Sequence, residues 1–183
     1  EICLALLHPM KLSIYMVSAV SSGGSVNYYS MVPAYEHRLT RPAFNFCYGP
    51  FGQIRDRDYI CIQSLDGVLT FFEQDSFAFS RMLSPNFLVP GPICYMAKID
   101  SFIICNNSMC IEAYRYQVLA AAAENVDQEP GREGTSGKKV QVDWSTNVGE
   151  HAQHISVTRF SRSLSASQQE ILVVGEHTVF AIK

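Results

Sequence analysis

A short apolar run, a tight turn and a second apolar run recur four times along this chain. The four turns lie at Pro9, Asp66-Gly67, Asn106-Asn107 and Gly175-Glu176. Glycine and asparagine accept the positive φ that tight hairpin turns require. The second and third turns are 41 residues apart, close to the period of about 40–45 residues of a four-stranded propeller blade. The repeat therefore predicts an all-β fold that forms part of a β-propeller.

The recurring unit predicts about four WD-like, four-stranded blades, with three, four, four and three strands present. The expected strands are 2–8, 11–18 and 31–39, then 43–48, 58–64, 68–73 and 77–83, then 93–98, 101–105, 109–116 and 139–145, and finally 154–160, 170–174 and 178–182. The run at 59–62 is apolar at every position, which fits a strand packed on both faces between neighbouring blades.

Two polar, Gly- and Ser-rich stretches, 20–31 and 121–139, lengthen the intervals between the outer turns. Both follow the second strand of a hairpin, so they are expected as loop insertions on one rim of the array. The run 117–126, with four consecutive alanines, favours a short helix before the second insertion. Val140, Val142 and Trp144 alternate with polar residues and are expected to share the apolar face of one strand.

Both ends of the sequence fall within predicted strands. We therefore expect residues 1–183 to be part of a single propeller domain that is incomplete at both ends. Apolar residues of the outermost blades, namely Leu4, Leu6, Ile171 and Val173, are then expected to meet water in the isolated segment.

Composition and charge restrict the classes of partner. The net charge of −3 offers no basic face for nucleic acid. Five of the six cysteines lie within apolar strand runs, and no signal peptide is visible, which favours a reducing, cytosolic-type compartment.

Two spacings resemble metal sites, and for both a structural interpretation is favoured. Cys105 and Cys110 flank a hairpin turn, and no second cysteine pair follows to complete the four ligands that zinc requires. His151 and His154 follow Glu150, but not in the order of a helical zinc-protease motif. No metal, cofactor, catalytic residue or small-molecule substrate is assigned, because phosphate-binding and nucleophile motifs are absent from the sequence.

One charged loop is a candidate interaction site. Arg55, Asp56, Arg57 and Asp58 alternate in charge immediately before a predicted strand. The simpler interpretation is a solvated loop. The alternative is a loop that pairs with another protein subunit, since rim loops of propellers carry binding.

Six runs together resemble the amino-terminal propeller of the parathyroid-hormone-responsive B1 family, also called the Bardet–Biedl syndrome 9 family. The runs are AYEHRL at 34–39, RDYICIQSLDG at 57–67, FEQDSFAF at 72–79, LVPGP at 88–92, YRYQVL at 114–119 and VDWSTNVG at 142–149. The resemblance covers nearly the whole chain, and the polar segments 20–31 and 125–137 depart from it.

The resemblance implies about four blades of a seven-bladed ring without enzymatic activity. It implies a scaffold subunit of the BBSome, a coat-like complex that traffics membrane proteins to and from cilia. The implied partners are other BBSome subunits, with ciliary membrane-protein cargo and the membrane reached through the complex. The implied locations are the cytoplasm, the cilium and its membrane, and the basal body and centriolar satellites. Two alternatives stay open: a glycoside-hydrolase type of enzyme propeller, and a peptide-binding propeller of another complex.

Overall fold

The computed structural model describes residues 2–22, 24–83, 90–121, 140–160 and 169–183. Its strands form four antiparallel sheets with three, four, four and three strands, as the repeat predicts. The first two sheets contain β1 (Ile2–His8), β2 (Lys11–Ser22) and β3 (Ser25–Arg38), then β4 (Ala43–Gly49), β5 (Tyr59–Ser64), β6 (Val68–Glu73) and β7 (Ser76–Met82). The last two contain β8 (Ile93–Met96), β9 (Ser101–Cys105), β10 (Cys110–Arg115) and β11 (Trp144–Asn147), then β12 (His154–Thr158), β13 (Glu170–Val174) and β14 (Val179–Ile182).

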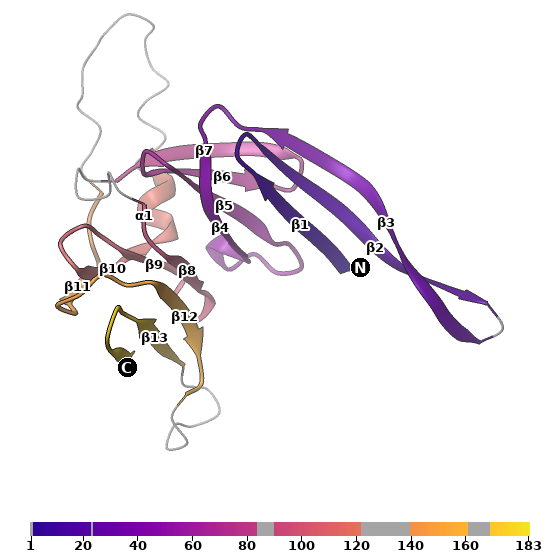
Figure 1. Cartoon of the computed structure of the whole chain (residues 1–183). Helices are drawn as coiled ribbons and strands as arrows, with labels where there is room; N and C mark the ends of the chain where they lie inside the picture. The colour runs from indigo at the N-terminus through magenta and orange to yellow at the C-terminus, as the bar shows by residue number, and fades with distance from the viewer. Residues whose placement is uncertain (1, 23, 84–89, 122–139, 161–168) are drawn as a thin grey trace, which may run out of the picture.

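The sheets follow one another without the two outermost sheets meeting (Figure 1). The first strands of successive sheets lie next to one another: β1 contacts β4, β4 contacts β8, and β8 contacts β12. Within the second and third sheets the strands are ordered as in the sequence, from β4 to β7 and from β8 to β11. This arrangement is an open stack of blades, which is the architecture of a partial β-propeller.

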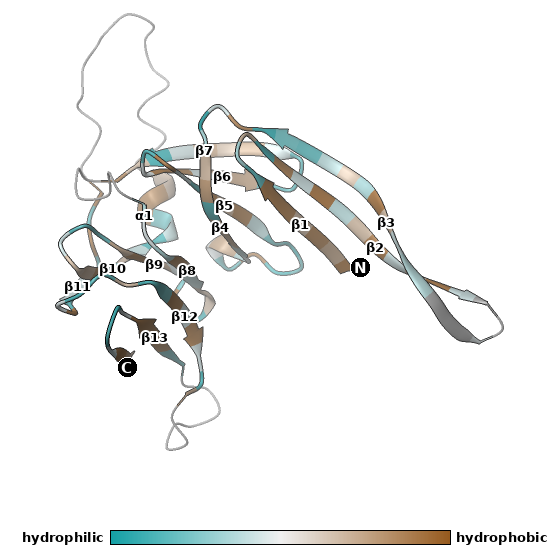
Figure 2. Cartoon of the chain, viewed as in Figure 1, coloured by the Kyte–Doolittle hydropathy of each residue, from teal (hydrophilic) through white to brown (hydrophobic). Residues whose placement is uncertain are grey.

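Three apolar clusters hold the blades together, one at each blade–blade contact. Strand β5 contributes side chains to two of these clusters. Ile60 and Ile62 pack with Leu12 and Ile14 of the first blade, whereas Cys61 packs with residues of the third. Because successive side chains of a strand point to opposite faces, the run at 59–62, which lies between two blades, presents apolar side chains to both of them. The prediction for the run at 59–62 is confirmed, and Figure 2 shows the hydrophobic colouring of β5 and of β1 in the neighbouring blade.

The stretch 20–31 is not a loop insertion, which corrects the prediction made from its composition. Strands β2 and β3 continue through it as a paired ribbon that reaches Ser22 and Ser25 and projects away from the blades (Figure 1). Paired Val20 and Tyr28 favour extended backbone despite the serines around them. Gly24, with φ of 85°, allows the tight reversal at the tip.

The third blade differs from its prediction at the last strand. Strand β11 begins only at Trp144. Val140 and Val142 precede it and pack against the cluster between the second and third blades, whereas half-buried Trp144 packs against the cluster between the third and fourth. The three residues therefore do not share one face. Helix α1 (Tyr116–Ala121) confirms the start of the predicted helix to within one residue. Residues 122–126 and the segment 125–137 lie outside the described residues.

The outermost blades expose only part of the apolar surface expected of them. Leu4 and Leu6 are 38% and 41% exposed, as predicted. Ile171 and Val173 are buried against the third blade, so for these two residues the prediction is wrong. Strand alternation assigns them to the inner face, and the sequence does not show which of the two faces a neighbour covers.

Candidate interaction sites at the two rims

Two candidate sites lie at opposite ends of the inner strands. The loop between β4 and β5 follows the last residues of β4 and includes Arg55 to Asp58. A cavity lies at the first residues of β4, β8 and β12, beside the β9–β10 and β13–β14 turns. The charged loop that the sequence indicates therefore lies at one rim. The cavity, which the sequence does not indicate, lies at the other.

All four side chains of the Arg55–Asp58 loop are exposed. They line an open groove of about 610 Å³ together with Ile54. The Arg57 guanidinium lies 3.2 Å from the Glu73 carboxylate and ties the loop to β6. Both partners are exposed, and such a pair contributes about 0–1 kcal/mol to stability. The loop is therefore a charged, solvent-facing surface, and its role as an interface remains a prediction.

A partly buried hydrogen-bond network anchors the start of this loop. The Tyr95 hydroxyl donates to Asp100 Oδ1 at 2.6 Å, and the Gly52 backbone N–H donates to the same oxygen at 2.9 Å. Burial, followed by the neighbouring Asp100 carboxylate, raises the pKa of Tyr95 well above its ordinary value. Gly52 has φ of 74° in the short helix η1 (Phe51–Gln53), a conformation that favours glycine. The chain thus leaves β4 in a fixed direction before it reaches the charged residues.

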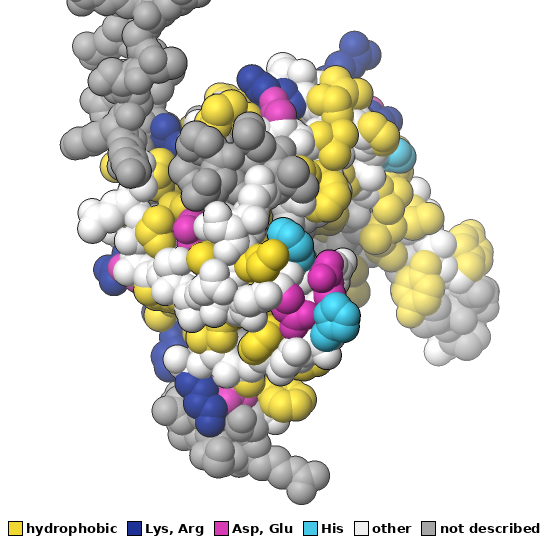
Figure 3. Space-filling model, turned by 60° about the vertical axis from the view of Figure 1, so that its left-hand side comes forward, with side chains coloured by type: hydrophobic (Ala, Val, Ile, Leu, Met, Phe, Trp, Pro, Cys, Tyr) yellow, Lys and Arg dark blue, Asp and Glu magenta, His cyan; other side chains and the backbone are white. Residues whose placement is uncertain are grey.

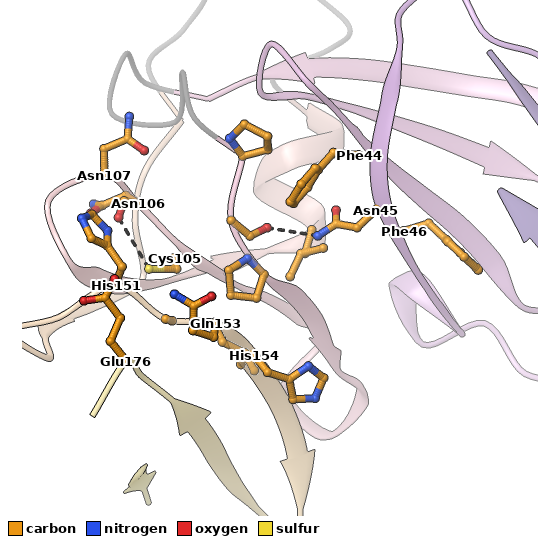
Figure 4. A pocket seen from close by; sticks show the side chains of 16 residues that line it. Phe44, Asn45, Phe46, Cys105, Asn106, Asn107, His151, Gln153, His154 and Glu176 are labelled. Carbon is orange, nitrogen blue, oxygen red and sulfur yellow. Dashed lines mark hydrogen bonds between the residues drawn. The ribbon is translucent and has the colours of Figure 1, made fainter. Parts of the chain in front are cut away.

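The cavity at the other rim has a volume of about 820 Å³ and is formed by three blades (Figure 4). Its described lining combines aromatic and proline side chains, amides, imidazoles and one carboxylate, and it contains no lysine or arginine. These residues are Phe44, Asn45, Phe46, Pro90, Gly91, Pro92, Ile93, Cys105, Asn106, Asn107, His151, Ala152, Gln153, His154, Ile155 and Glu176. The volume is within the range of about 300–1,000 Å³ that is usual for ligand pockets.

Asn45, which lines this cavity, and its buried neighbour Gln63, which does not, have amide atoms without hydrogen-bond partners among the described residues. Asn45 donates through Nδ2 to the Gly91 carbonyl at 3.1 Å, but its buried Oδ1 has no partner within the described part of the chain. Gln63 is fully buried (0% exposed), and neither of its amide atoms is paired with a described residue. Asn45 and Gln63 are directly opposite each other in the β4–β5 register. A buried polar group left unpaired costs about 1–3 kcal/mol, so this pair requires an explanation.

The sequence contains one signal for the unpaired amides. Gln63 is the only residue with an amide side chain in the strand YICIQS, in which every residue is buried. A glutamine in such a strand is unusual because burial of its amide must be compensated by hydrogen bonds.

Glu150, Glu176 and His177 form a cluster beside the cavity, with possible ligand atoms all within 4.8 Å of one another. Acidic and imidazole side chains gather on this face of the molecule (Figure 3). Glu150 Oε2 accepts the His177 backbone N–H at 2.7 Å and so holds the β13–β14 turn. Burial acts to raise the Glu150 pKa, but hydrogen bonds such as this one keep it below its ordinary value. A Cβ at Gly175 would lie 2.5 Å from Glu150, so glycine is needed for this close approach.

The two histidines considered from the sequence, His151 and His154, line the cavity as exposed side chains and are not members of this cluster. Cys105 and Cys110 are free thiols on either side of a turn. Asn106 Oδ1 accepts the backbone N–H groups of Ser108 and Cys110 at 2.9 and 3.1 Å. A side-chain amide therefore holds this turn, in agreement with the structural interpretation of the cysteines.

Buried Cys61 and half-buried Cys94 lead to a prediction about reactivity. Burial raises the pKa of Cys61, and burial together with the Cys47 thiol raises that of Cys94 to about 12. The thiolate is the reactive form, so at about pH 8 both groups stay protonated and are also shielded. We expect iodoacetamide to modify them far more slowly in the folded full-length protein than in guanidinium chloride, as measured by mass spectrometry of peptides. Equal rates in the two states would contradict the burial of these strands, and exposed Cys3 serves as the internal reference.

The fold defines the class of protein as a segment of a β-propeller. Its charged loop and its cavity lie on opposite rims. Over residues 1–183 the chain matches the family described as PTHB1 N-terminal. The chain belongs to this family, which confirms the resemblance seen in the sequence.

Three relatives show how far the similarity extends. The chain is 46% identical to Protein PTHB1 of Xenopus laevis over 189 residues, and the match covers 98% of the chain and 21% of that protein. It is 43% identical to Protein PTHB1 of Homo sapiens over 185 residues, covering 98% of the chain and 20% of that protein. It is 28% identical to the pthb1 homolog of Caenorhabditis elegans over 159 residues, and this match covers 87% of the chain and 19% of that protein. The chain thus spans about one fifth of the length of these relatives.

The fold is similar to that of BBS1N, which was crystallised in complex with ARL6DN. One such structure matches 98% of this chain and 46% of its own with a TM-score of 0.61 and 11% identity. A second structure matches 98% of this chain and 60% of its own chain, with a TM-score of 0.55 and 10% identity. At this identity the likeness shows the fold alone. Among the helices of the described residues, none has the length and apolar character needed to cross a bilayer.

Proposed function

We propose that this chain is part of a non-enzymatic propeller that serves as a scaffold of the BBSome, the coat-like complex that traffics membrane proteins to and from cilia. Its partners are other BBSome subunits, and the complex links it to membrane-protein cargo and to the membrane. The proposed locations are the cytoplasm, the cilium and its membrane, and the basal body and centriolar satellites.

The observation that carries this proposal is the match to the PTHB1 N-terminal family over the whole of residues 1–183. The structure adds physical support, because propeller rims present loops on a rigid stack of sheets. The similar fold of BBS1N was crystallised with a protein bound to it, and by analogy we propose protein binding for this chain as well. We further propose that the exposed Arg55–Asp58 loop is one of the contacts between subunits.

The loop proposal predicts a charge-dependent loss of assembly. Arg55 and Arg57 are exposed, so reversing their charges with Arg55→Glu and Arg57→Glu should leave the fold intact. We expect the double variant of the full-length protein, expressed in ciliated cells, to recover less of at least one BBSome subunit in co-purification, because rim charges steer and orient association.

A matched control reverses two exposed basic residues at the opposite rim. Lys11 and Arg41 each form a surface ion pair there, with Glu36 and Asp66. Lys11→Glu with Arg41→Glu should leave co-purification unchanged. Wild-type recovery of all subunits by the loop variant would contradict the loop interface. Failure of the wild-type protein itself to co-purify with BBSome subunits would contradict the proposed function.

A further inference from the structure

We propose that Cys47 and Cys61 form a redox modification site, at which a hydroperoxide oxidises the two thiols to a disulfide between β4 and β5. This inference goes beyond the proposed scaffold function and does not depend on it. Three observations support the proposal: the two cysteines are directly opposite each other, their side chains share one face, and one of the two thiols is partly exposed.

The β4–β5 register places Cys47 directly opposite Cys61. Directly opposite residues of an antiparallel pair have Cα atoms about 4.5–5.5 Å apart, which is within the range of about 4.4–6.8 Å that disulfides span. No other two cysteines of the chain are directly opposite each other in the described strand pairs. A disulfide between Cys47 and Cys61 therefore joins strands that already lie at the required distance.

Both side chains lie at the contact between the second and third blades. Buried Cys61 belongs to the apolar cluster there, and half-buried Cys47 packs against the same cluster. Burial, followed by a hydrogen bond with the Cys47 thiol, raises the pKa of Cys61, so the two sulfur atoms are close neighbours. Half-buried Cys94 packs instead against the cluster between the third and fourth blades. The shared face therefore selects Cys61, and not Cys94, as the partner of Cys47.

The two thiols have different roles in the oxidation. Cys47 is partly exposed, so a peroxide reaches its sulfur first. This sulfur attacks one peroxide oxygen, the O–O bond breaks, and a sulfenic acid and one water form. The Cys61 sulfur then attacks the Cys47 sulfur: the S–S bond forms, the S–O bond breaks, and hydroxide leaves with the Cys61 proton as a second water. Two thiols thus lose two electrons, and hydrogen peroxide is reduced to two water molecules.

Burial of Cys61 has two opposing effects on the second step. Its raised pKa keeps the thiol protonated and slows the attack, because the thiolate is the nucleophile. Its fixed position beside Cys47 favours the attack, because two groups already held together need not be brought together. Cys61 is also 0% exposed, which shields it from direct attack by peroxide. We therefore expect a slow but selective oxidation that stops at the disulfide.

The disulfide closes a segment that contains the charged loop. Residues 47–61 include η1 and the Arg55–Asp58 loop. The bond makes a ring of about 15 residues, which restricts the unfolded chain. Disulfides in a reducing compartment are usually transient, so a thiol reductant is expected to reopen the ring. The bond is therefore a reversible link at the base of the loop.

The test uses the full-length protein, which is treated with hydrogen peroxide while folded and then denatured with N-ethylmaleimide to block free thiols. Digestion with trypsin, without reduction, yields peptide 39–55, whose only cysteine is Cys47, and peptide 58–81, whose only cysteine is Cys61. We expect mass spectrometry to find these two peptides joined after peroxide treatment, and dithiothreitol to separate them. Treatment in guanidinium chloride, where the strands no longer hold the thiols together, should give far less of the joined product.

Variants identify the pair. Cys47→Ser should abolish the joined product and leave Cys61 as a free, blockable thiol. Cys110→Ser, at another half-buried thiol, is the matched control and should leave the yield of the joined product unchanged. Circular dichroism of each protein before oxidation checks that the variants are folded.

The proposal is wrong if the folded wild-type protein yields Cys47 only as a blocked thiol, a sulfinic acid or a sulfonic acid. It is also wrong if Cys47 is joined to peptide 82–98, whose only cysteine is Cys94, or if folded and denatured protein give equal yields of the joined product. These outcomes are distinct from failure of the proposed function, which is read from co-purification of BBSome subunits with the wild-type protein.

Discussion

Replacing Phe51 with alanine is expected to lower the free energy of unfolding of the complete propeller by about 3–5 kcal/mol. Phe51 is fully buried between the second and third blades. Its ring centroid lies 4.6 Å from that of Tyr95 and 4.7 Å from that of Phe102, both in edge-to-face geometry. Truncation removes the apolar contacts and leaves a cavity that the rigid strands on both sides cannot fill.

The measurement is equilibrium denaturation of the full-length protein, monitored by a probe within the propeller. Tyr48→Ala is the matched control, because Tyr48 is an aromatic residue in the preceding strand β4 and is exposed. We expect this control to shift stability by no more than about 0.5 kcal/mol. A Phe51→Ala protein that unfolds at the wild-type denaturant concentration would show that the blade contact does not depend on this ring.

Residues 1–183 expressed alone are expected to self-associate. Ile2, Leu4 and Leu6 present an exposed apolar face on β1, and Val179 is exposed on β14 at the other end of the stack. The free edges of the outermost sheets also offer unpaired backbone groups, which are templates for association. We propose that further blades of the complete propeller cover these faces, as neighbouring blades do at the three contacts that the structure contains.

Sedimentation and thermal melting of the segment and of the full-length protein test this expectation. We expect the segment to form large or polydisperse species, and Leu4→Lys with Leu6→Lys to reduce their size, because charge on an exposed strand opposes association. Ser18→Lys with Ser30→Lys is the control, since it adds the same charge on the projecting ribbon and away from this face. A monomeric segment with one sharp, reversible transition would contradict the open architecture.

Local pattern was enough to predict the blades. Turn residues such as Asp66 and Gly67 locate the hairpins, and the strands on either side are specified by their apolar runs. The run at 59–62 even indicated that its strand is covered on both faces. The same rules failed for the β2–β3 ribbon, because serine and glycine content suggested a loop while Val20 and Tyr28 pair across two strands. They also failed for Ile171 and Val173, because alternation defines two faces without showing which one a neighbour covers.

The sequence by itself determined the strand pairs, the count of three, four, four and three, and the family, since each depends on residues close together along the chain. Only the tertiary structure decided that Phe51, in a Gly-Pro-Phe-Gly stretch that reads as a chain break, lies in a core. Only it placed Gln63, whose amide has no partner among the described residues, opposite Asn45, and brought Glu176 from another blade to the cavity that Asn45 lines. Asn45 and Glu176, for example, are more than a hundred positions apart in the sequence. Residues so far apart come together only through the packing of one blade on another, which local propensity does not encode.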